Sequence, residues 1–436
     1  MKAVDAKDNT VVIGGGIAGL VAAIYVARAG HSVTLMDTSK KFGGRAMTNE
    51  KQGAYLNLGV HAFYEGGEGE EVLKELNLCL KGGNPPASAV AVWDEQMHPF
   101  PAGPVQLMMS KLYSVKGKME MVRMMMKLPS LDSTLLQGIS LQEWVEREFQ
   151  CPMVRHALYA VSRSNSFVPH PELLDAGAAV GQLKRTLTGK AFYIDEGWGS
   201  LIRQLSDLAA RSGVVLVPGT RAEALVLQDG GLRGVRLKDG SVIHTSNAIV
   251  CAGPQDLVKL LGEAATPAFI KQIGLATPIK AACLDVVLHD ISGKRPSFLA
   301  GFWLDQPLFY NNPSTVAKMS NNGSSVVHMI KHLGDSPGDA KADLHQLEKG
   351  LDLVWPGWRQ YERTRQYLPC ITVAHDYRKA AGDAGFGSEV DGVVGLFVAG
   401  DWVGTTGMLA DASFASAKIA ANAVIGRLDH PFEARR

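Results

Sequence analysis

The residues with the clearest chemical potential are three glycines in G-x-G-x-x-G spacing and an acid that follows them. The glycines are Gly14, Gly16 and Gly19, and Asp37 stands 18 positions past the last of them. In this pattern Gly14 allows a tight turn, Gly16 lets the backbone approach a pyrophosphate, and Gly19 lets a helix pack closely on a strand. The carboxylate of Asp37 can accept hydrogen bonds from an adenosine ribose. The spacing therefore predicts a site for a dinucleotide.

The segments around these glycines predict the elements that such a site needs. Residues 11–13 form an apolar run typical of a buried parallel strand, and residues 17–29 predict a helix rich in Ala, Leu and Val. A second apolar strand over residues 31–35 completes a βαβ unit. Ile17 and Ala18 open the helix, so its free N–H groups and the positive end of its dipole would face the phosphates.

Two further motifs follow within the first 61 residues. The first, KKFGGR, ends in Gly43, Gly44 and Arg45. Glycines let the backbone pass close to a cofactor, and a guanidinium can clamp a pyrophosphate through two hydrogen bonds. The second, YLNLGVH, ends in Gly59, Val60 and His61. A lone histidine of this kind is more often structural than catalytic.

The second half of the chain adds a β-rich stretch and a closing motif. Residues 214–253 contain alternating apolar runs separated by Asp-Gly turns, which are the strongest local signal for hairpins. Residues 395–421 join a buried strand ending in Gly400 and Asp401 to a helix of small residues. We expect this helix to begin within ten positions of the strand.

Together these motifs resemble the FAD-binding segments of the flavin amine oxidase superfamily. That group includes amine and amino-acid oxidases, phytoene and carotenoid desaturases, and protoporphyrinogen oxidase. The resemblance implies that FAD is the cofactor. It implies that FAD is bound by residues from all these motifs: Gly14, Gly16, Ile17, Ala18, Gly19, Asp37, Gly43, Gly44, Arg45, Gly59, Val60, His61, Ala222, Ala252, Gly253, Gly400, Asp401, Met408, Leu409 and Ala410.

The resemblance also implies individual roles for some of these residues. Arg45 would bind the pyrophosphate, and Asp401 the ribityl or phosphate part of FAD. Residues 59–61 would run beside the flavin, which makes His61 a candidate catalytic residue. Residues 408–410 would provide backbone at the flavin N1–C2=O edge, where a helix dipole stabilises the anion of the reduced ring. Ala222 stands where the family has a valine beside the adenine.

The expected fold class is α/β, with a Rossmann-type FAD-binding domain completed by a β-meander and an α+β substrate-binding domain. We expect the FAD-binding domain to comprise residues 1–85, 191–255 and 373–436. The substrate-binding domain would comprise residues 86–190 and 256–372.

Three hypotheses describe the chemistry. In amine-oxidising relatives, a lysine in a strand holds a water at flavin N5, and Lys280 is the candidate here, although it could equally be a solvated strand residue. The first hypothesis is therefore hydride transfer to flavin N5 from a C–N bond of an amine or amino-acid-like, fairly apolar substrate. The second is C–C desaturation of a polyene or porphyrinogen-like substrate at or near a membrane, because Leu409 replaces an aromatic residue common in amine oxidases. The third is a protein that holds FAD without turnover.

Composition narrows the class of protein and its partners. The 436 residues are 46% hydrophobic and 20% charged, with a net charge of +1, which indicates a globular chain with no feature typical of nucleic-acid binding. Five cysteines without a C-x-x-C pair argue against a disulfide framework or a zinc site, and we expect no metal. The polar first ten residues and the unpaired cysteines predict a cytoplasmic protein. With no second G-x-G-x-x-G unit, O2 or another carrier would accept the electrons.

A methionine-rich stretch within residues 105–161 stays open to three interpretations. Seven methionines between residues 108 and 126 alternate with lysines and an arginine. They would line an adaptable apolar pocket, form a basic surface that contacts a membrane, or pack between helices. Of the last two, we favour ordinary packing over membrane contact.

Overall fold

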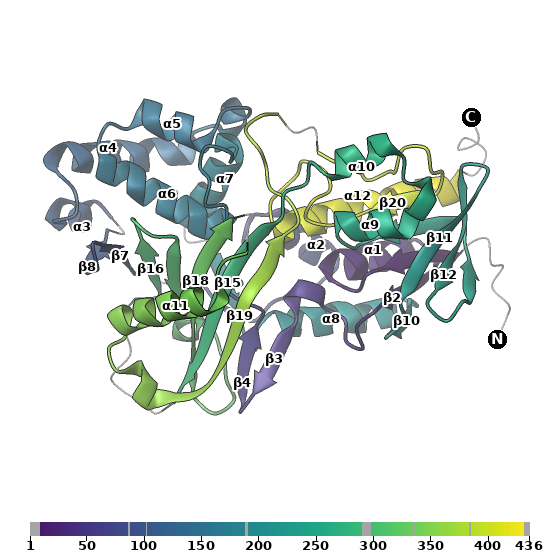
Figure 1. The fold of residues 1–436 in the computed structure, drawn as a ribbon, viewed down its shortest axis with the longest axis horizontal. Coiled ribbons are helices and arrows are strands. Elements are labelled where there is room, and N and C mark those ends of the chain that lie inside the picture. The colour runs from purple at the N-terminus through teal and green to yellow at the C-terminus, as the bar shows by residue number, and fades with distance from the viewer. Residues whose placement is uncertain are drawn as a thin grey trace.

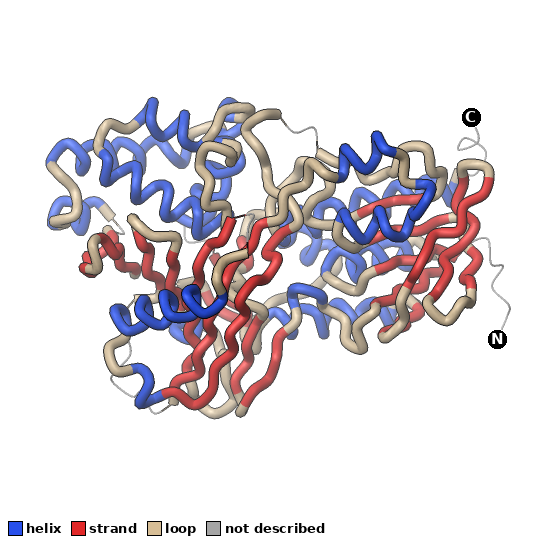
Figure 2. Tube along the Cα trace, in the orientation of Figure 1, coloured by secondary structure: helices blue, strands red, loops and turns tan. Residues whose placement is uncertain are grey.

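The computed structural model describes residues 9–85, 88–101, 103–187, 191–289, 298–334, 337–382 and 385–430. Within them the chain forms two lobes, each built on its own β-sheet (Figures 1 and 2). The predicted domain boundaries at residues 86 and 190 lie outside the described residues.

The first lobe is built on a five-stranded parallel sheet in the order β10-β2-β1-β14-β20. Its strands are β10 (Val215–Pro218), β2 (Ser32–Asp37), β1 (Asn9–Ile13), β14 (Asn247–Val250) and β20 (Leu396–Val398). Widely separated segments therefore meet in one sheet, as a Rossmann-type domain requires. The expected βαβ unit is present, with α1 (Ile17–Arg28) between β1 and β2.

Helices and a small second sheet cover the two faces of this parallel sheet. On one face α1 packs in a hydrophobic cluster with α2 (Glu68–Glu75), α8 (Trp198–Arg211) and α12 (Ala410–Asp429). On the other face lie α9 (Pro254–Leu261) and the antiparallel meander β11 (Ala222–Gln228), β12 (Gly231–Leu237) and β13 (Val242–His244). The Asp-Gly turns predicted this meander, and the expected fold class is confirmed.

The second lobe is built on a seven-stranded mixed sheet in the order β19-β15-β18-β17-β16-β7-β8. Its strands are β19 (Glu362–Ala374), β15 (Ile279–Leu288), β18 (Ser325–Gly334), β17 (Leu308–Asn311), β16 (Ala300–Trp303), β7 (Ala89–Trp93) and β8 (Gln96–Phe100). Only the β16–β7 pair is parallel among the pairs in this sheet. β19 ends at Ala374, two residues beyond the predicted domain boundary at residue 372.

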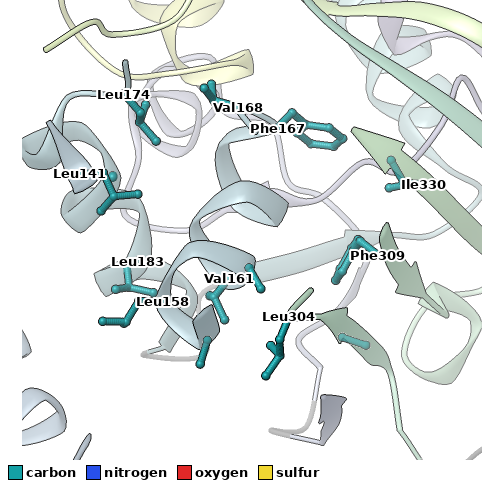
Figure 3. Close-up of a cluster of buried hydrophobic side chains, with 14 of the residues drawn as sticks. Leu141, Leu158, Val161, Phe167, Val168, Leu174, Leu183, Leu304, Phe309 and Ile330 are labelled. Carbon is teal, nitrogen blue, oxygen red and sulfur yellow. The ribbon is translucent and has the colours of Figure 1, made fainter. Parts of the chain in front are cut away.

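Helices cover both faces of the mixed sheet. α11 (Ala340–Val354) packs on one face, where Ala282, Leu284 and Val286 of β15 contribute to the cluster. The other face carries five helices: α3 (Pro104–Met109), α4 (Val115–Lys127), α5 (Leu141–Glu148), α6 (Pro152–Ser166) and α7 (Ala176–Leu187). Figure 3 shows side chains from these helices, Leu158 and Leu183 among them, in one cluster with Phe309 and Ile330 of the sheet.

Short elements connect the two lobes and complete the chain. They are β3 (Thr48–Lys51), β4 (Ala54–Asn57), β5 (Phe63–Tyr64), β6 (Gly82–Gly83), β9 (Ala191–Ile194), α10 (Pro267–Ile273) and six 3₁₀ turns: Gly44–Ala46, Leu128–Ser130, Ser133–Leu136, Gly262–Ala264, Pro313–Thr315 and Trp358–Tyr361. In the part of the chain that the structure describes, no helix combines the length and the apolar character needed to span a bilayer.

The methionine-rich stretch does not pack as we favoured from the sequence. Met121 and Met124 are buried, as ordinary helix packing requires, but Met108, Met109, Met119 and Met126 are exposed. The spacing of apolar residues shows which face of a helix they occupy. In α4 methionines occupy the buried face and also the exposed face opposite to it. The preferred interpretation is therefore wrong for the four exposed side chains.

Candidate functional site

A cavity of about 1,320 Å³ lies between the two lobes and is lined by residues of both. It is larger than the roughly 300–1,000 Å³ typical of a site for one small ligand. The predicted cofactor-binding residues that line it are Gly14, Gly16, Ile17, Ala18, Asp37, Gly43, Gly44, Arg45, Val60, His61, Ala222, Ala252, Gly253, Gly400, Asp401, Met408, Leu409 and Ala410. We call this part of the wall the cofactor half. Gly19, Gly59 and Lys280 do not line the cavity.

Two glycine turns meet at the start of α1 and form a shallow cradle. The Gly43 N–H donates a 2.8 Å hydrogen bond to the Gly15 carbonyl, which holds the second turn against the first. Gly16 begins α1 without any side-chain cap, and a Cβ on Gly16 would meet nothing closer than 3.9 Å. The helix thus presents unpaired N–H groups and open space on its cavity side, which fits a pyrophosphate.

The other two glycines of the motif shape the cradle from behind. Gly14 has a φ of +108°, and a Cβ there would lie 2.6 Å from the Cys251 carbonyl oxygen. A Cβ on Gly19 would lie 1.8 Å from the Gly14 carbonyl oxygen. Gly19 is therefore a packing residue that lets α1 approach the turn, in agreement with its expected role and with its place outside the cavity wall.

Asp37 stands at the end of β2 and faces the same cavity. Its Oδ2 accepts a 2.6 Å hydrogen bond from the Gly15 N–H, and its Oδ1 accepts one of 2.6 Å from the Ser39 N–H. These bonds fix the carboxylate, and each oxygen keeps a lone pair that a ribose hydroxyl can use.

Arg45 and Asp401 form a bidentate ion pair across the cavity wall. Nη1 and Nη2 of Arg45 donate to the two carboxylate oxygens at 2.5 and 2.9 Å, and the His375 N–H donates to Asp401 at 3.0 Å. Burial tends to raise the pKa of Asp401, but the charge and hydrogen bonds of Arg45 outweigh it and hold the pKa below its usual value. Arg45 also donates to the Val373 carbonyl. The guanidinium is thus held in place, with part of its surface facing the cavity.

His61 lines the cavity, but both ring nitrogens lie against the backbone. Nδ1 is 3.1 Å from the Gly59 carbonyl oxygen, and Nε2 is 3.1 Å from the Arg45 carbonyl oxygen. Burial lowers the pKa of His61, and a neutral imidazole can donate only one of these two bonds. This geometry favours a positioning role for His61, joining the segment at Gly59 to Arg45, over the catalytic role predicted for it.

Lys280, the other residue with a predicted catalytic role, does not line the cavity. It stands in β15, yet the residue of this strand that packs against Gly59 is Cys283. A Cβ on Gly59 would lie 3.1 Å from the Cys283 Sγ, and the φ of +92° at Gly59 also favours glycine. The hypothesis that Lys280 holds a water beside the flavin has no support from this placement.

The N-terminus of α12 also points at the cavity. Leu409 precedes the helix with a φ of +55°, a backbone conformation that residues other than glycine rarely adopt. No side chain caps the helix. In the first turn Asp411 accepts hydrogen bonds from the Gly69 N–H at 3.0 Å and from Arg185 at 2.9 Å. Burial nevertheless raises the pKa of Asp411 to about 6.

We expect Asp411 to titrate well above an ordinary aspartate. Because its folded pKa lies above the unfolded value of 3.8, its contribution to the free energy of unfolding is full below pH 3.8 and is lost as the pH rises through about 6. Infrared difference spectra between the wild-type protein and Asp411→Asn should show a protonated carboxyl band that disappears with a midpoint near pH 6. A midpoint near pH 4 would show that burial does not dominate at this carboxyl.

The rest of the cavity wall is mainly aromatic and aliphatic. Phe302 of β16 lies between Phe100 and Phe309, with ring centroids 5.3 and 5.2 Å away. The apolar wall continues with residues from the helical layer and the sheet: Met125, Met126, Leu128, Val161, Phe167 and Leu299. We call these nine residues the substrate half, since they lie outside the predicted cofactor motifs. Lys184 also lines the cavity.

From the sequence, only the methionine-rich stretch pointed to this substrate half, because one interpretation of it was a pocket lining and Met125 and Met126 line the cavity. Three of the four phenylalanines in the substrate half, Phe100, Phe302 and Phe309, come from β8, β16 and β17, and they meet only because those strands share one sheet. Arg185 was missed for the same reason, since its partner Asp411 lies 226 residues away.

Comparison with solved structures supports the fold. An oxidoreductase from Methanosarcina mazei superposes with a TM-score of 0.76 at 17% identity, covering 95% of this chain and 100% of that one. Putrescine oxidase superposes with a TM-score of 0.72 at 13% identity, covering 97% of this chain and 99% of that one. At such identities the likeness concerns the fold alone.

Comparison of sequences identifies the family. An L-amino-acid oxidase from Pseudechis australis is 57% identical over 53 residues, which are 12% of this chain and only 10% of that protein. The sequence profile described as flavin containing amine oxidoreductase matches residues 17–282, which is more than half of the chain. The chain therefore belongs to the flavin containing amine oxidoreductase family, and its cofactor is FAD.

Proposed function

We propose that this protein is an FAD-dependent dehydrogenase that removes a hydride from carbon in a large, mostly apolar substrate. The observation that carries the proposal is the substrate half of the cavity, where Phe100, Phe302 and Phe309 form one aromatic row. Aromatic walls of this kind favour flat or conjugated molecules, because rings stack and pack at such distances. Bound FAD supplies the acceptor for the hydride.

The residues of the cofactor half would hold FAD along its length. Asp37 and Ala222 lie at the end suited to the adenosine, and the glycine cradle with Arg45 suits the pyrophosphate. Val60, His61 and the N-terminus of α12 suit the flavin, because free N–H groups stabilise negative charge at a helix start. The chain's own work would be to bind, orient the substrate and exclude water.

C–C dehydrogenation fits this cavity better than oxidation of a simple amine. Leu409 lies where an aromatic residue would help to cage an amine in many amine oxidases, and Lys280 does not reach the cavity. An apolar polyene or a ring system needs neither group. We therefore favour the C–C reaction over the C–N reaction.

A second candidate is C–N oxidation of an apolar amino-acid-like substrate. It is favoured by Lys184, a cation on the cavity wall whose Nζ donates a 2.8 Å hydrogen bond to the Leu131 carbonyl and whose charge would attract a substrate carboxylate. The matched segment of the L-amino-acid oxidases is too short to choose between the two reactions.

A panel of substrates under anaerobic conditions tests both candidates. The purified yellow protein is mixed with polyenes, porphyrinogens, hydrophobic amino acids and simple amines, and loss of the flavin absorbance is recorded. Bleaching by a polyene or porphyrinogen supports the proposal, and bleaching only by amines or amino acids contradicts it. Adding O2 or a soluble carrier afterwards identifies the electron acceptor. Protein that no compound bleaches would instead be an FAD-holding protein without turnover.

Phe302→Ala should lower kcat/KM at least about tenfold for whichever apolar compound bleaches the flavin. The variant removes the central ring of the aromatic row. Substrate binding would lose both the apolar area that this ring buries and its contacts with the substrate. Phe298→Ala is the matched control, since Phe298 packs on Tyr310 at 5.7 Å and does not line the cavity. Equal losses in the two variants would show that the row does not recognise substrate.

A further inference from the structure

The most unusual surface in the described part of the chain lies on α3 and α4. Among the described residues, 15 large apolar side chains are exposed, and seven of them fall between residues 105 and 135. In Figure 1 these two helices lie at the left end of the molecule, away from the end where both termini are drawn. Such a concentration of exposed apolar side chains marks an interaction site.

These side chains are ordered along one face of each helix. On α3, Val105, Met108 and Met109 are exposed while Leu107 is buried. On α4, Val115, Met119 and Met126 lie within about 40° of one another around the helix axis, at about 100° per residue. The Lys118 ammonium donates a 2.6 Å hydrogen bond to the Met108 carbonyl and so fixes the two helices side by side. We call these six residues the exposed stripe: Val105, Met108, Met109, Val115, Met119 and Met126.

The charges around the exposed stripe are almost all positive. Exposed Lys111, Lys116, Arg123 and Lys127 flank it. The acid in this segment, Glu120, is turned inward, where it accepts hydrogen bonds from the N–H groups of residues 150 and 151. Apolar side chains flanked by outward-facing cations are typical of a helix that lies in the interface of an anionic bilayer.

The same helices form the rim of the substrate cavity. Met126 belongs to the exposed stripe, with 70% of its surface exposed, and it also lines the cavity next to Met125 and Leu128. Pro104, at the start of α3, lines the cavity as well. The rim of the substrate half therefore opens at the exposed stripe.

We infer that the exposed stripe docks on a lipid bilayer bearing anionic headgroups, and that the apolar substrate passes between this bilayer and the cavity. The inference rests on the proposed function, because only an apolar substrate would be drawn from lipid. The cations around the exposed stripe would attract the anionic headgroups. Because the exposed stripe continues into the rim of the cavity, a substrate could pass from the bilayer into the cavity along it.

Vesicle binding by the FAD-loaded full chain tests the inference. The protein is sedimented with vesicles of phosphatidylcholine alone and with vesicles that also contain phosphatidylglycerol. We expect binding to the anionic vesicles that weakens as salt is added. The variant M108S/M109S/M119S should lower the partition coefficient at least about tenfold. The variant K111Q/K116Q/R123Q should lose the preference for anionic vesicles.

A control on the far side of the molecule makes the test specific. The variant I270S/L275S changes two exposed apolar side chains at α10, and it should leave vesicle binding unchanged. No binding of the wild-type protein, or equal losses in the stripe and α10 variants, would overturn the inference. So would light scattering that shows a dimer lost in the stripe variant, since the stripe would then join two copies. Retained yellow colour and bleaching by a detergent-dispersed substrate would leave the proposed function intact in each case.

Discussion

Arg45→Met is expected to release FAD and to lower the free energy of unfolding by about 1–3 kcal/mol, since the pair is open to the cavity on its Arg45 side. The substitution removes the charge suited to the pyrophosphate and leaves Asp401 without its bidentate partner. The Asp401 side chain is only 3% exposed, so its carboxylate would stay buried in the variant. Of the hydrogen bonds described above for this carboxylate, the one from the His375 N–H would remain. Flavin absorbance after gel filtration and urea unfolding measure the two effects.

Two further variants separate the effects of Arg45 on stability and on the cofactor. Arg45→Met combined with Asp401→Asn should recover much of the stability without recovering FAD, because the unpaired charge is gone. Arg203→Met breaks the exposed pair with Glu196 and should change stability by no more than about 1 kcal/mol. Full FAD retention in Arg45→Met would show that the guanidinium serves only Asp401.

Gly19→Ala should reduce FAD affinity at least about tenfold and destabilise the first lobe by roughly 1–3 kcal/mol. The added Cβ would lie 1.8 Å from the Gly14 carbonyl oxygen, and neither backbone can yield without moving α1 away from the glycine cradle. Fluorescence titration of FAD into the apoprotein measures the affinity.

Gly426→Ala is the matched control for this substitution. Gly426 also lies inside a helix, α12, but a Cβ there would meet nothing within 4 Å. Alanine should therefore be neutral or stabilise by up to about 1 kcal/mol, since it favours the helix. If both variants behave alike, the close approach of α1 to the Gly14 turn is not what FAD binding requires.

The first lobe could be predicted from the sequence because its signals are local. The glycines at 14, 16 and 19, the run of β1 and the Asp-Gly turns of the meander each depend on neighbours within a few residues. These signals predicted the parallel sheet and most of the cofactor half of the cavity.

Contacts between distant segments could not be predicted in this way. Arg45 and Asp401 were each expected to face FAD, yet their pairing joins residues 356 positions apart. The side of the sheet on which Lys280 lies depends on register shifts next to it in the pairing of β15 with β18 and β19. The alternation of apolar and polar residues in the sequence does not reveal such shifts. On α4, periodicity identifies two methionine faces, and only the packing of the helical layer decides that Met121 and Met124 are the buried ones.

The most direct test of the cofactor site is an experimental structure of the FAD-loaded protein. We predict FAD extended along the cofactor half, with its ribose at Asp37, its pyrophosphate between Gly16 and Arg45, and its flavin beside Val60 and Leu409. The aromatic row at Phe302 should remain open to substrate. FAD bound elsewhere, or a flavin that fills the space beside Phe302, would contradict this assignment of the two halves.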